Sequence, residues 1–537
     1  MIVRHVTLGL LMLSLLLRAH GADAQRNIFD LFKSDQTLAS QYFDRGELKE
    51  AIRLAARTRT TDSYLIIARS NYLLKEYQSS LNAYDSYVAA GRTLSSDDNR
   101  IYAEVCLTLK KYSEALAAFQ QVLKTDPTNQ EVLNKIWRIS NINYLYEDSV
   151  HFATRLLTIN TTNGEWGAAP VPGGLLFLSN RPPANPVKKV DAATHQSFYR
   201  MFRTREKPDT LLEGWGKLYG KPAVYDKAPP VAGNAGGFYI YGNGTKMIFT
   251  ASADEKNAKG IQTLGLYFAE WQSGSWKVTH RFEHNLAAWS VTNPSLDTVQ
   301  HVLYFASDKP EGFGGMDIYQ SKFVDGRWAD PVNLGDAINT SGDEIFPCYQ
   351  QGTLYFSSSG QPGMGGLDIF KALVSGNQID EAVNLGYPMN SSFDDFSISF
   401  TDSKNNHGFF SSNRKHGGLD DDIYEFDMDM QTYPFEITGV IKQMDHAWNK
   451  DSIESRVLKN AKIILVDNVR NITVQETSSD ESGGFSLRIP YFSKYAVRVV
   501  DSDGVENIVV FEIPRQRKAS TVHEIVIIKD IFQSLTR

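Results

Sequence analysis

Residues 303–307 read Leu-Tyr-Phe-Ala-Ser, and residues 314–319 read Gly-Gly-Met-Asp-Ile-Tyr. The same pair of phrases returns about fifty residues later, within 354–370, and once more within 408–424. Strand-like aromatic runs and glycine turns that recur at this interval are typical of β-propeller blades. Propellers usually present surfaces, so the repeat favours a chain that holds partners over one that transforms a substrate.

Two earlier copies of the strand phrase bring the number of copies to five. They are 175–179 (Leu-Leu-Phe-Leu-Ser) and 247–251 (Met-Ile-Phe-Thr-Ala). The later phenylalanines recur at a nearly even interval, at Phe249, Phe305, Phe356 and Phe410. Phe177 lies further from Phe249 than that interval, so we expect an insertion in the first blade. The sequence therefore predicts a propeller of five blades over residues 161–430.

Helical periodicity dominates residues 25–160, with no strand-like alternation. Small and aromatic residues at Ala39, Tyr42, Gly46 and Ala51 fit one helix–turn–helix unit, and the clearest unit begins near Ala103. A weaker unit lies between these two, and a fourth is predicted from about 131 to 159. The interval along the chain from Ala115 to Ser149 matches the tetratricopeptide period of about 34 residues. We therefore expect a solenoid of helical hairpins.

This region resembles tetratricopeptide-repeat (TPR) proteins, which present a concave groove to a peptide or protein segment. Position in the repeat places eight residues on the groove as partner-binding candidates: Phe43, Arg69, Tyr72, Arg100, Glu104, Asn134, Arg138 and Asn141. Three arginines on one concave face would suit an acidic or carboxylate-terminated ligand. The alternative is that these residues form solvated helix faces and that the array only packs against the next domain.

Strand-like alternation returns between residues 433 and 530, with Gly and Asp turns between the runs. The runs include 461–465, 485–490, 495–499 and 509–513, which suggests a sandwich of about seven strands. Their order resembles the carboxypeptidase regulatory-like domain, a transthyretin-like fold. That resemblance implies a domain without an active site of its own.

Residues 1–24 have the features of a secretory signal peptide: a basic start, an apolar run from Leu8 to Leu17, and Ala22-Asp23-Ala24 as cleavage site. We expect an exported, soluble mature chain without direct membrane insertion, and a short tail at 531–537. The formal net charge is −7. A mildly acidic chain argues against nucleic-acid binding, which needs basic patches. Two cysteines, Cys106 and Cys348, could pair in an oxidising compartment or serve as small buried hydrophobes.

The propeller repeat resembles the PD40, or WD40-like, repeat of TolB-type propellers. An aspartate precedes Ile-Tyr or Ile-Phe in each strong copy, and we expect these residues to accept backbone N–H groups in a turn: Asp317, Asp368 and Asp422. A metal site at 420–422 is disfavoured because consecutive carboxylates point different ways. Sialidase boxes, G-x-S-x-G and HExxH are absent. We expect no catalytic residue, no cofactor and no metal.

The order of the three regions resembles exported Bacteroidota proteins of the PorE-like family, which belong to the type IX secretion and gliding machinery. The resemblance implies a non-catalytic periplasmic scaffold, peripheral to the outer membrane, with envelope or outer-membrane proteins as partners. An alternative is a propeller that senses a glycan or peptide ligand in its central funnel, and a hydrolase is a weaker one. Such relatives usually carry an OmpA-like domain that binds peptidoglycan; the sequence ends at Arg537 without one, so peptidoglycan binding is not expected.

Overall fold

The computed structural model describes residues 33–58, 60–142, 145, 152–182, 190–191, 194–212, 216–231, 235–256, 262–376, 378–401, 406–428, 435–445, 454–467, 472–489, 494–500, 506–512 and 523–530. The predicted signal peptide (1–24) and tail (531–537) lie outside these residues. Among the helices of the described part, none is long and apolar enough to cross a membrane.

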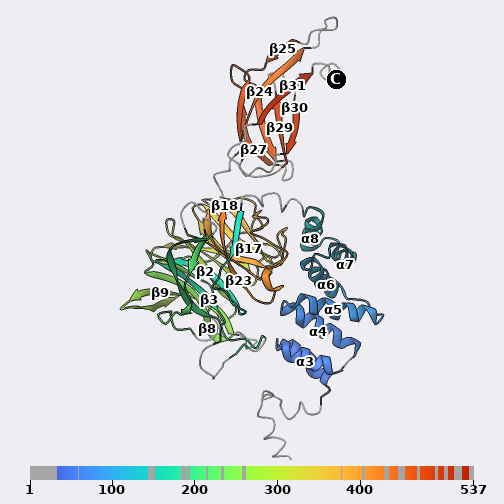
Figure 1. The fold of residues 1–537 in the computed structure, drawn as a ribbon, viewed down its shortest axis with the longest axis vertical. Helices are drawn as coiled ribbons and strands as arrows, with labels where there is room; N and C mark the ends of the chain where they lie inside the picture. Colours follow the sequence, from blue (N-terminus) through green and yellow to red (C-terminus); the bar gives the residue numbers. More distant parts are fainter. Residues whose placement is uncertain are drawn as a thin grey trace, which may run out of the picture. The chain divides into compact units, whose positions relative to one another are not determined.

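The described N-terminal part is helical and contains α2 (Asp35–Asp44), α3 (Leu48–Thr58), α4 (Thr61–Leu73), α5 (Tyr77–Ala89), α6 (Ser96–Thr108), α7 (Tyr112–Thr125) and α8 (Gln130–Ser140) (Figure 1). The first six form three helical hairpins, α2–α3, α4–α5 and α6–α7. Ser34, Thr60 and Ser95 cap the first helix of each hairpin, because their side-chain oxygens accept backbone N–H groups there.

Each hairpin turn contains one residue with positive φ: Gly46 (75°), Lys75 (61°) and Lys110 (59°). The next residue along donates its N–H back into the preceding helix, as in Glu47 N to Tyr42 O at 2.9 Å and Lys111 N to Cys106 O at 2.8 Å. This is the hydrogen bond of a Schellman motif, which ends a helix and turns the chain. Fully buried alanines, such as Ala103 and Ala115, allow the two helices to pack closely.

Five antiparallel sheets follow, named here sheets 1 to 5 in chain order. Sheet 1 contains β2 (Glu165–Val171), β3 (Gly174–Ser179), β4 (Arg200–Leu212), β5 (Gly216–Tyr219) and β6 (Ala223–Val224); sheet 2 contains β7 (Phe238–Tyr241), β8 (Lys246–Lys256), β9 (Gln262–Gln272) and β10 (Ser275–Arg281); sheet 3 contains β11 (Val291–Asp297), β12 (Val302–Ser307), β13 (Asp317–Val324), β14 (Arg327–Trp328) and β15 (Val332–Asn333); sheet 4 contains β16 (Glu344–Gln350), β17 (Thr353–Ser358), β18 (Asp368–Ser375), β19 (Gln378–Ile379) and β20 (Val383–Asn384); and sheet 5 contains β21 (Asp395–Phe400), β22 (His407–Ser412), β23 (Asp422–Met428) and β1 (Phe152–Leu156).

The first strand of each sheet contacts the first strand of the next, in the order β2, β7, β11, β16, β21 and back to β2. The five sheets therefore form a ring, which is a β-propeller-like architecture. The second strand of each sheet carries the sequence repeat and is buried on both faces. Successive aromatic side chains therefore point alternately to the preceding sheet and to the following sheet of the ring. Phe305 of β12 packs with side chains of sheet 2, whereas Tyr304 packs with side chains of sheet 4. A hydrophobic cluster of this kind lies between every pair of neighbouring sheets.

Strand β1 closes the ring. It precedes all other strands in the chain, yet it pairs antiparallel with β23 of the last sheet, Phe152 opposite Met428 and Leu156 opposite Tyr424. The sequence interpretation of a fourth helical unit reaching residue 159, and of a helical region ending at 160, was wrong here: residues 152–156 are a strand. The reason is tertiary, because the unpaired edge of β23 supplies hydrogen bonds that local helical periodicity cannot anticipate.

The C-terminal part contains eight described strands: β24 (Phe435–Asp445), β25 (Glu454–Val457), β26 (Lys462–Asp467), β27 (Ile472–Ser478), β28 (Gly484–Ile489), β29 (Lys494–Val500), β30 (Glu506–Glu512) and β31 (His523–Asp530). They form two sheets, one of β25, β24, β28 and β31 and the other of β27, β26, β29 and β30. Ile441 and Leu487 of one sheet join Leu465 and Val497 of the other in one buried cluster. Two sheets thus share a core.

Candidate functional site

A cavity of about 220 Å³ lies where the five inner strands meet, and all five of them line it. Its shape comes from a bulge that recurs on four of these strands. The pairing register shifts between Trp166 and Ala169 on β2, and at the corresponding places on β11, β16 and β21. Such a bulge re-aims side chains locally, here toward the centre of the ring.

One residue of each bulge has positive φ: Gly167 (67°), Asn293 (54°), Phe346 (55°) and Ser397 (55°). Glycine and asparagine adopt this conformation readily, but a phenylalanine there costs about 1–2 kcal/mol. Phe346 keeps it while its ring packs against Trp166 at 5.6 Å and Phe396 at 4.9 Å between centroids. The strained residue is therefore held in place by an aromatic cluster beside the cavity.

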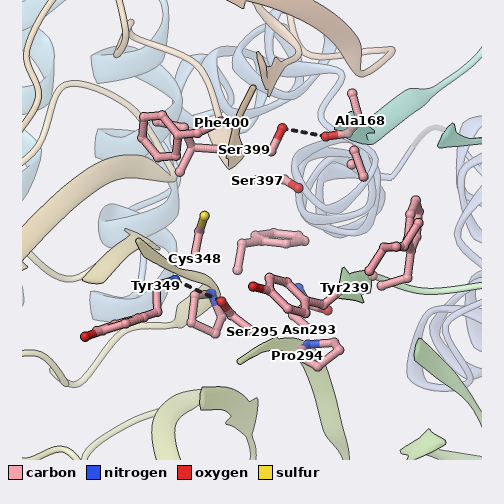
Figure 2. A pocket seen from close by; sticks show the side chains of 18 of the residues that line it. Ala168, Tyr239, Asn293, Pro294, Ser295, Cys348, Tyr349, Ser397, Ser399 and Phe400 are labelled. Carbon is pink, nitrogen blue, oxygen red and sulfur yellow. Dashed lines mark hydrogen bonds between the residues drawn. The ribbon is translucent and has the colours of Figure 1, made fainter. Parts of the chain in front are cut away.

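Three polar side-chain groups face this space from three strands: the Tyr239 hydroxyl, the Asn293 amide nitrogen and the Ser397 hydroxyl (Figure 2). None of the three has a hydrogen-bond partner among the described residues, although Asn293 Oδ1 accepts from Thr292 Oγ1 at 2.6 Å. Other polar groups of the wall are already used. Ser399 Oγ donates to Ala168 O at 2.6 Å, and Tyr349 N donates to Ser295 Oγ at 2.8 Å.

The wall of the cavity is electrically neutral at physiological pH. Its described lining contains no Asp, Glu, Lys, Arg or His. Burial raises the pKa of the Cys348 thiol to about 12, and burial is also the main cause that raises the pKa of Tyr239 to about 12. Both groups therefore stay protonated at pH 7, and Cys348 is not a thiolate nucleophile. The arrangement can donate and accept hydrogen bonds and contact apolar surface, but its described lining offers no general base.

The carboxyl groups with raised pKa lie elsewhere in the ring. Burial is the largest cause that raises the pKa of Glu344 and of Asp368 to about 7, and it also raises that of Asp395. Such shifts can mark an active site. Here, however, the side chains are 0%, 1% and 0% exposed and do not line the cavity.

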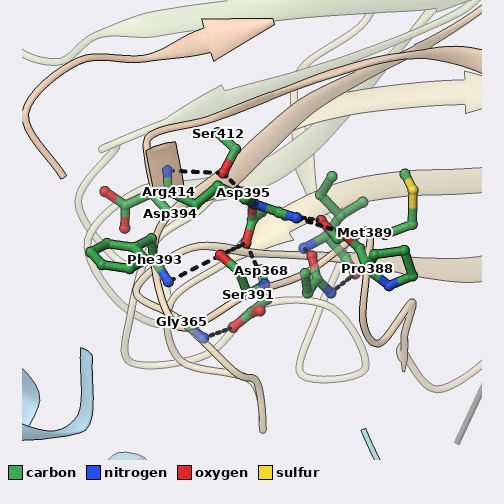
Figure 3. Close-up of polar contacts among 12 residues, drawn as sticks. Gly365, Asp368, Pro388, Met389, Ser391, Phe393, Asp394, Asp395, Ser412 and Arg414 are labelled. Atoms are coloured by element: carbon green, nitrogen blue, oxygen red, sulfur yellow. Dashed lines mark hydrogen bonds and ion pairs between the residues drawn. The ribbon is translucent and has the colours of Figure 1, made fainter. Parts of the chain in front are cut away.

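These carboxyl groups are hydrogen-bonded within the chain instead. Thr340 N donates to Glu344 at 2.7 Å, and Gly365 N donates to Asp368 at 2.7 Å. Arg414 pairs with Asp395 and also donates to Pro388 O at 2.7 Å (Figure 3). Their contacts are those of groups that hold the connections between sheets.

The predicted repeat aspartates lie at the start of β13, β18 and β23. Asp317 accepts from Phe313 N at 2.6 Å and Gly314 N at 3.2 Å, and Asp368 accepts from Gly365 N at 2.7 Å. Asp422 is fully buried at the same position in the last sheet. The described residues contain no group of three or more His, Cys, Asp or Glu side chains that could hold a metal ion.

The predicted groove residues fall into separate sets. Tyr72 and Arg100 both bind Glu104, Arg100 at 2.8 Å. Arg69 forms a two-pronged ion pair with Asp98, both bonds 2.7 Å, and lines an open hollow on α2 and α4. Phe43 packs partly buried on the core of the first hairpin.

Of the remaining three groove candidates, Asn134 and Arg138 lie on α8, and Asn141 follows its last residue. Asn134 donates to Gly360 O at 3.1 Å and Arg138 to Gly365 O at 3.1 Å, both in the connection between β17 and β18. Arg138 is only 2% exposed, and Asn141 donates to Trp137 O of α8. The structure therefore gives these side chains partners within the chain.

Sequence reasoning missed the asparagines that join the sheets: Asn160, Asn339 and Asn390, called here the linker asparagines. Each accepts from the backbone N–H of a buried isoleucine and donates to its carbonyl; for Asn160 and Ile423 the distances are 2.9 and 2.8 Å. The equivalent distances are 2.8 and 3.0 Å at Asn339 and 2.7 and 2.8 Å at Asn390. A signal existed in the sequence, because residues 159–161 and 338–340 both read Ile-Asn-Thr and each is followed, four residues after the Thr, by a Glu.

Both cysteines are free thiols, Cys106 in α6 and Cys348 beside the cavity. Burial, the largest cause, raises the pKa of Cys106 to about 11. The sequence left open whether the two cysteines form a disulfide or serve as small buried hydrophobic residues. In the structure they are not bonded to each other.

No protein-family model and no curated protein matches this chain. Among solved structures it is similar to a protein of unknown function from Dyadobacter fermentans, with 10% identity over 52% of this chain and 99% of that one, and a TM-score of 0.31. It is also similar to an α-L-arabinofuranosidase from Lactobacillus brevis (12% identity, 50% and 91% covered, TM-score 0.32) and to a thermostable family-43 glycoside hydrolase (11% identity, 56% and 96% covered, TM-score 0.33). Similarity this weak carries no inference about activity.

Proposed function

We propose that this chain is a non-catalytic, periplasmic interaction scaffold, peripheral to the outer membrane. Its partners would be envelope or outer-membrane proteins, and the type IX secretion and gliding machinery is the first candidate. The observation that supports this proposal best is the combination of a neutral central cavity with carboxylates that are fully buried in structural hydrogen bonds. The described lining of the cavity offers hydrogen-bonding groups but no carboxyl, imidazole or amino group that could act as an acid–base pair.

The finer fold assignments belong to the same proposal. In the helical part, three capped hairpins with buried alanines on both helices, as at Ala103 and Ala115, support a TPR solenoid. In the ring, the repeated Asp-Ile-Tyr strands support PD40-type blades. The two C-terminal sheets, with their shared core, support a transthyretin-like sandwich of the carboxypeptidase regulatory-like kind.

The hollow on α2 and α4 is the part of the helical region that we propose for partner binding. Gln36, Ser40, Leu65 and Arg69 are among the residues that line it. Its lining combines amide, hydroxyl and apolar side chains with the charged Asp62 and Arg69, which suits a polypeptide segment that presents backbone amides along with polar and apolar side chains.

Crosslinking and affinity purification of the tagged protein from its native envelope tests the scaffold. We expect secretion or gliding components of the outer membrane to be recovered, crosslinked to the helical part or the ring. Ser40→Arg, which blocks the hollow, should reduce this recovery. The matched variant Ser79→Arg, at an exposed position of α5 outside the hollow, should not. Recovery of the protein alone, or equal recovery with both variants, would contradict the proposal.

A further inference from the structure

The central cavity carries an inference that is independent of the scaffold. We propose that it binds an uncharged sugar, most simply the terminal residue of a neutral glycan. The argument rests on three properties of the described lining: its neutrality, its unused hydrogen-bonding groups and its size.

The neutral lining selects against charged ligands. A carboxylate or ammonium group of a ligand would lose its hydration in the cavity and find no residue of opposite charge there. This desolvation costs several kcal/mol. A neutral ligand with many hydroxyl groups has no such cost. The described lining therefore favours sugars without carboxylate, sulfate or phosphate groups.

The free polar groups match hydroxyl chemistry. Tyr239 and Ser397 each offer a hydroxyl, which both donates and accepts, and Asn293 offers an amide N–H. They come from three different strands and face the same space (Figure 2). Adjacent sugar hydroxyls can satisfy such a set, because each of them also donates and accepts.

The apolar part of the wall completes the match. The rings of Tyr239 and Phe346 are partly exposed in the cavity, and neighbouring aromatics hold both rings in position, Tyr241 stacking on Tyr239 at 6.3 Å. A sugar ring presents C–H groups to such surfaces. Phe346 has a strained backbone conformation, with φ of 55°, and residues strained in this way are concentrated at ligand-binding and active sites.

The geometry disfavours an extended peptide, which is the other neutral candidate. A peptide would add to the exposed edge of an inner strand through backbone hydrogen bonds. The bulges at Gly167, Asn293, Phe346 and Ser397 interrupt that edge on four of the five strands. The volume of about 220 Å³ is also below the roughly 300–1,000 Å³ of pockets that enclose drug-sized ligands, so one compact ring fits better than a chain.

The test uses the full mature protein on an array of neutral, sialylated and uronic glycans, followed by calorimetric titration with the best glycan. We expect binding of neutral glycans only, with a dissociation constant of about 0.1–1 mM, as for one small ring. Tyr239→Phe removes one hydroxyl, and Asn293→Gly removes the amide N–H without adding a charge, while keeping a residue that tolerates positive φ. Each should weaken binding by about fivefold.

Tyr241→Phe is the matched control, because Tyr241 stacks on Tyr239 but does not line the cavity. Its affinity should equal that of the wild type, and thermal unfolding should show that all three variants are folded. The proposal is overturned if no neutral glycan binds, if charged glycans bind equally well, or if Tyr239→Phe and Asn293→Gly leave the affinity unchanged. Binding of an acetylated and amidated tripeptide at the same residues, in place of glycans, would overturn the sugar assignment.

Discussion

Asn390→Ala should be among the most damaging single substitutions in the ring. The Asn390 side chain accepts from Ile369 N at 2.7 Å, donates to Ile369 O at 2.8 Å and donates to Asn384 Oδ1 at 2.9 Å. Ile369 is fully buried, so its backbone cannot turn to water instead. In the variant, the carbonyl of Ile369 would still accept a hydrogen bond from Leu385 N, at 3.1 Å. The N–H of Ile369 would lose its acceptor, Asn390 Oδ1.

The magnitude follows from these contacts. An orphaned buried N–H costs about 1–3 kcal/mol, and each other lost hydrogen bond costs about 0.5–1.5 kcal/mol. We therefore expect the free energy of unfolding to fall by about 2–6 kcal/mol. Asn160→Ala removes the same pair of bonds to Ile423, but Asn160 is only partly buried, so water can replace part of the loss. Its expected cost is about 1–2 kcal/mol, near the lower end of the range for such hydrogen bonds.

Urea unfolding of the protein, followed by tryptophan fluorescence, measures both variants. Trp166, Trp271, Trp276 and Trp328 belong to the strands of the ring, so the signal reports on it. Asn339→Ala is the internal check, because Asn339 is 2% exposed and makes the same bonds as Asn390. A loss below about 1 kcal/mol for Asn390→Ala, or a larger loss for Asn160→Ala than for Asn390→Ala, would refute the reasoning.

Three further outcomes are expected. Arg414→Ala should lower the unfolding free energy by about 3–5 kcal/mol, because it leaves buried Asp395 without its ion-pair partner, whereas Arg414→Lys should cost less; equal losses in urea unfolding would contradict this. Burial raises the pKa of Glu344 from an ordinary 4.5 to about 7, so between these values the unfolded state ionises while the folded state keeps its proton, and stability falls as pH rises. Glu344→Gln should flatten that fall between pH 5 and 7.5, and an unchanged slope in thermal unfolding would count against it. Arg138→Ala should lower the unfolding free energy by about 2–4 kcal/mol, since it removes a buried bond to Gly365 O; Lys124→Ala, on the exposed last turn of α7, should leave it within about 0.5 kcal/mol.

The repeated phrase in the sequence was enough to predict the second strand of each sheet of the ring, because a short apolar run bounded by turns is a local property. Leu-Tyr-Phe at 303–305 must be buried on both faces, and β12 is indeed buried at every position. The helical hairpins were equally readable, since turns such as Gly46 act through neighbours in the chain. Even the candidate aspartates could be placed at the starts of β13, β18 and β23.

Only the tertiary structure decided how the ring closes and what its centre holds. Strand β1 has no repeat phrase of its own, and its partner β23 is the last strand of the ring along the chain, so local periodicity carried no information about their pairing. The cavity is likewise built from single residues on strands that are far apart in the sequence, such as Tyr239, Asn293 and Ser397. Each looks ordinary in its own strand. They line one cavity because the closed ring brings the five inner strands together, and that convergence is a property of the closed fold rather than of any one segment.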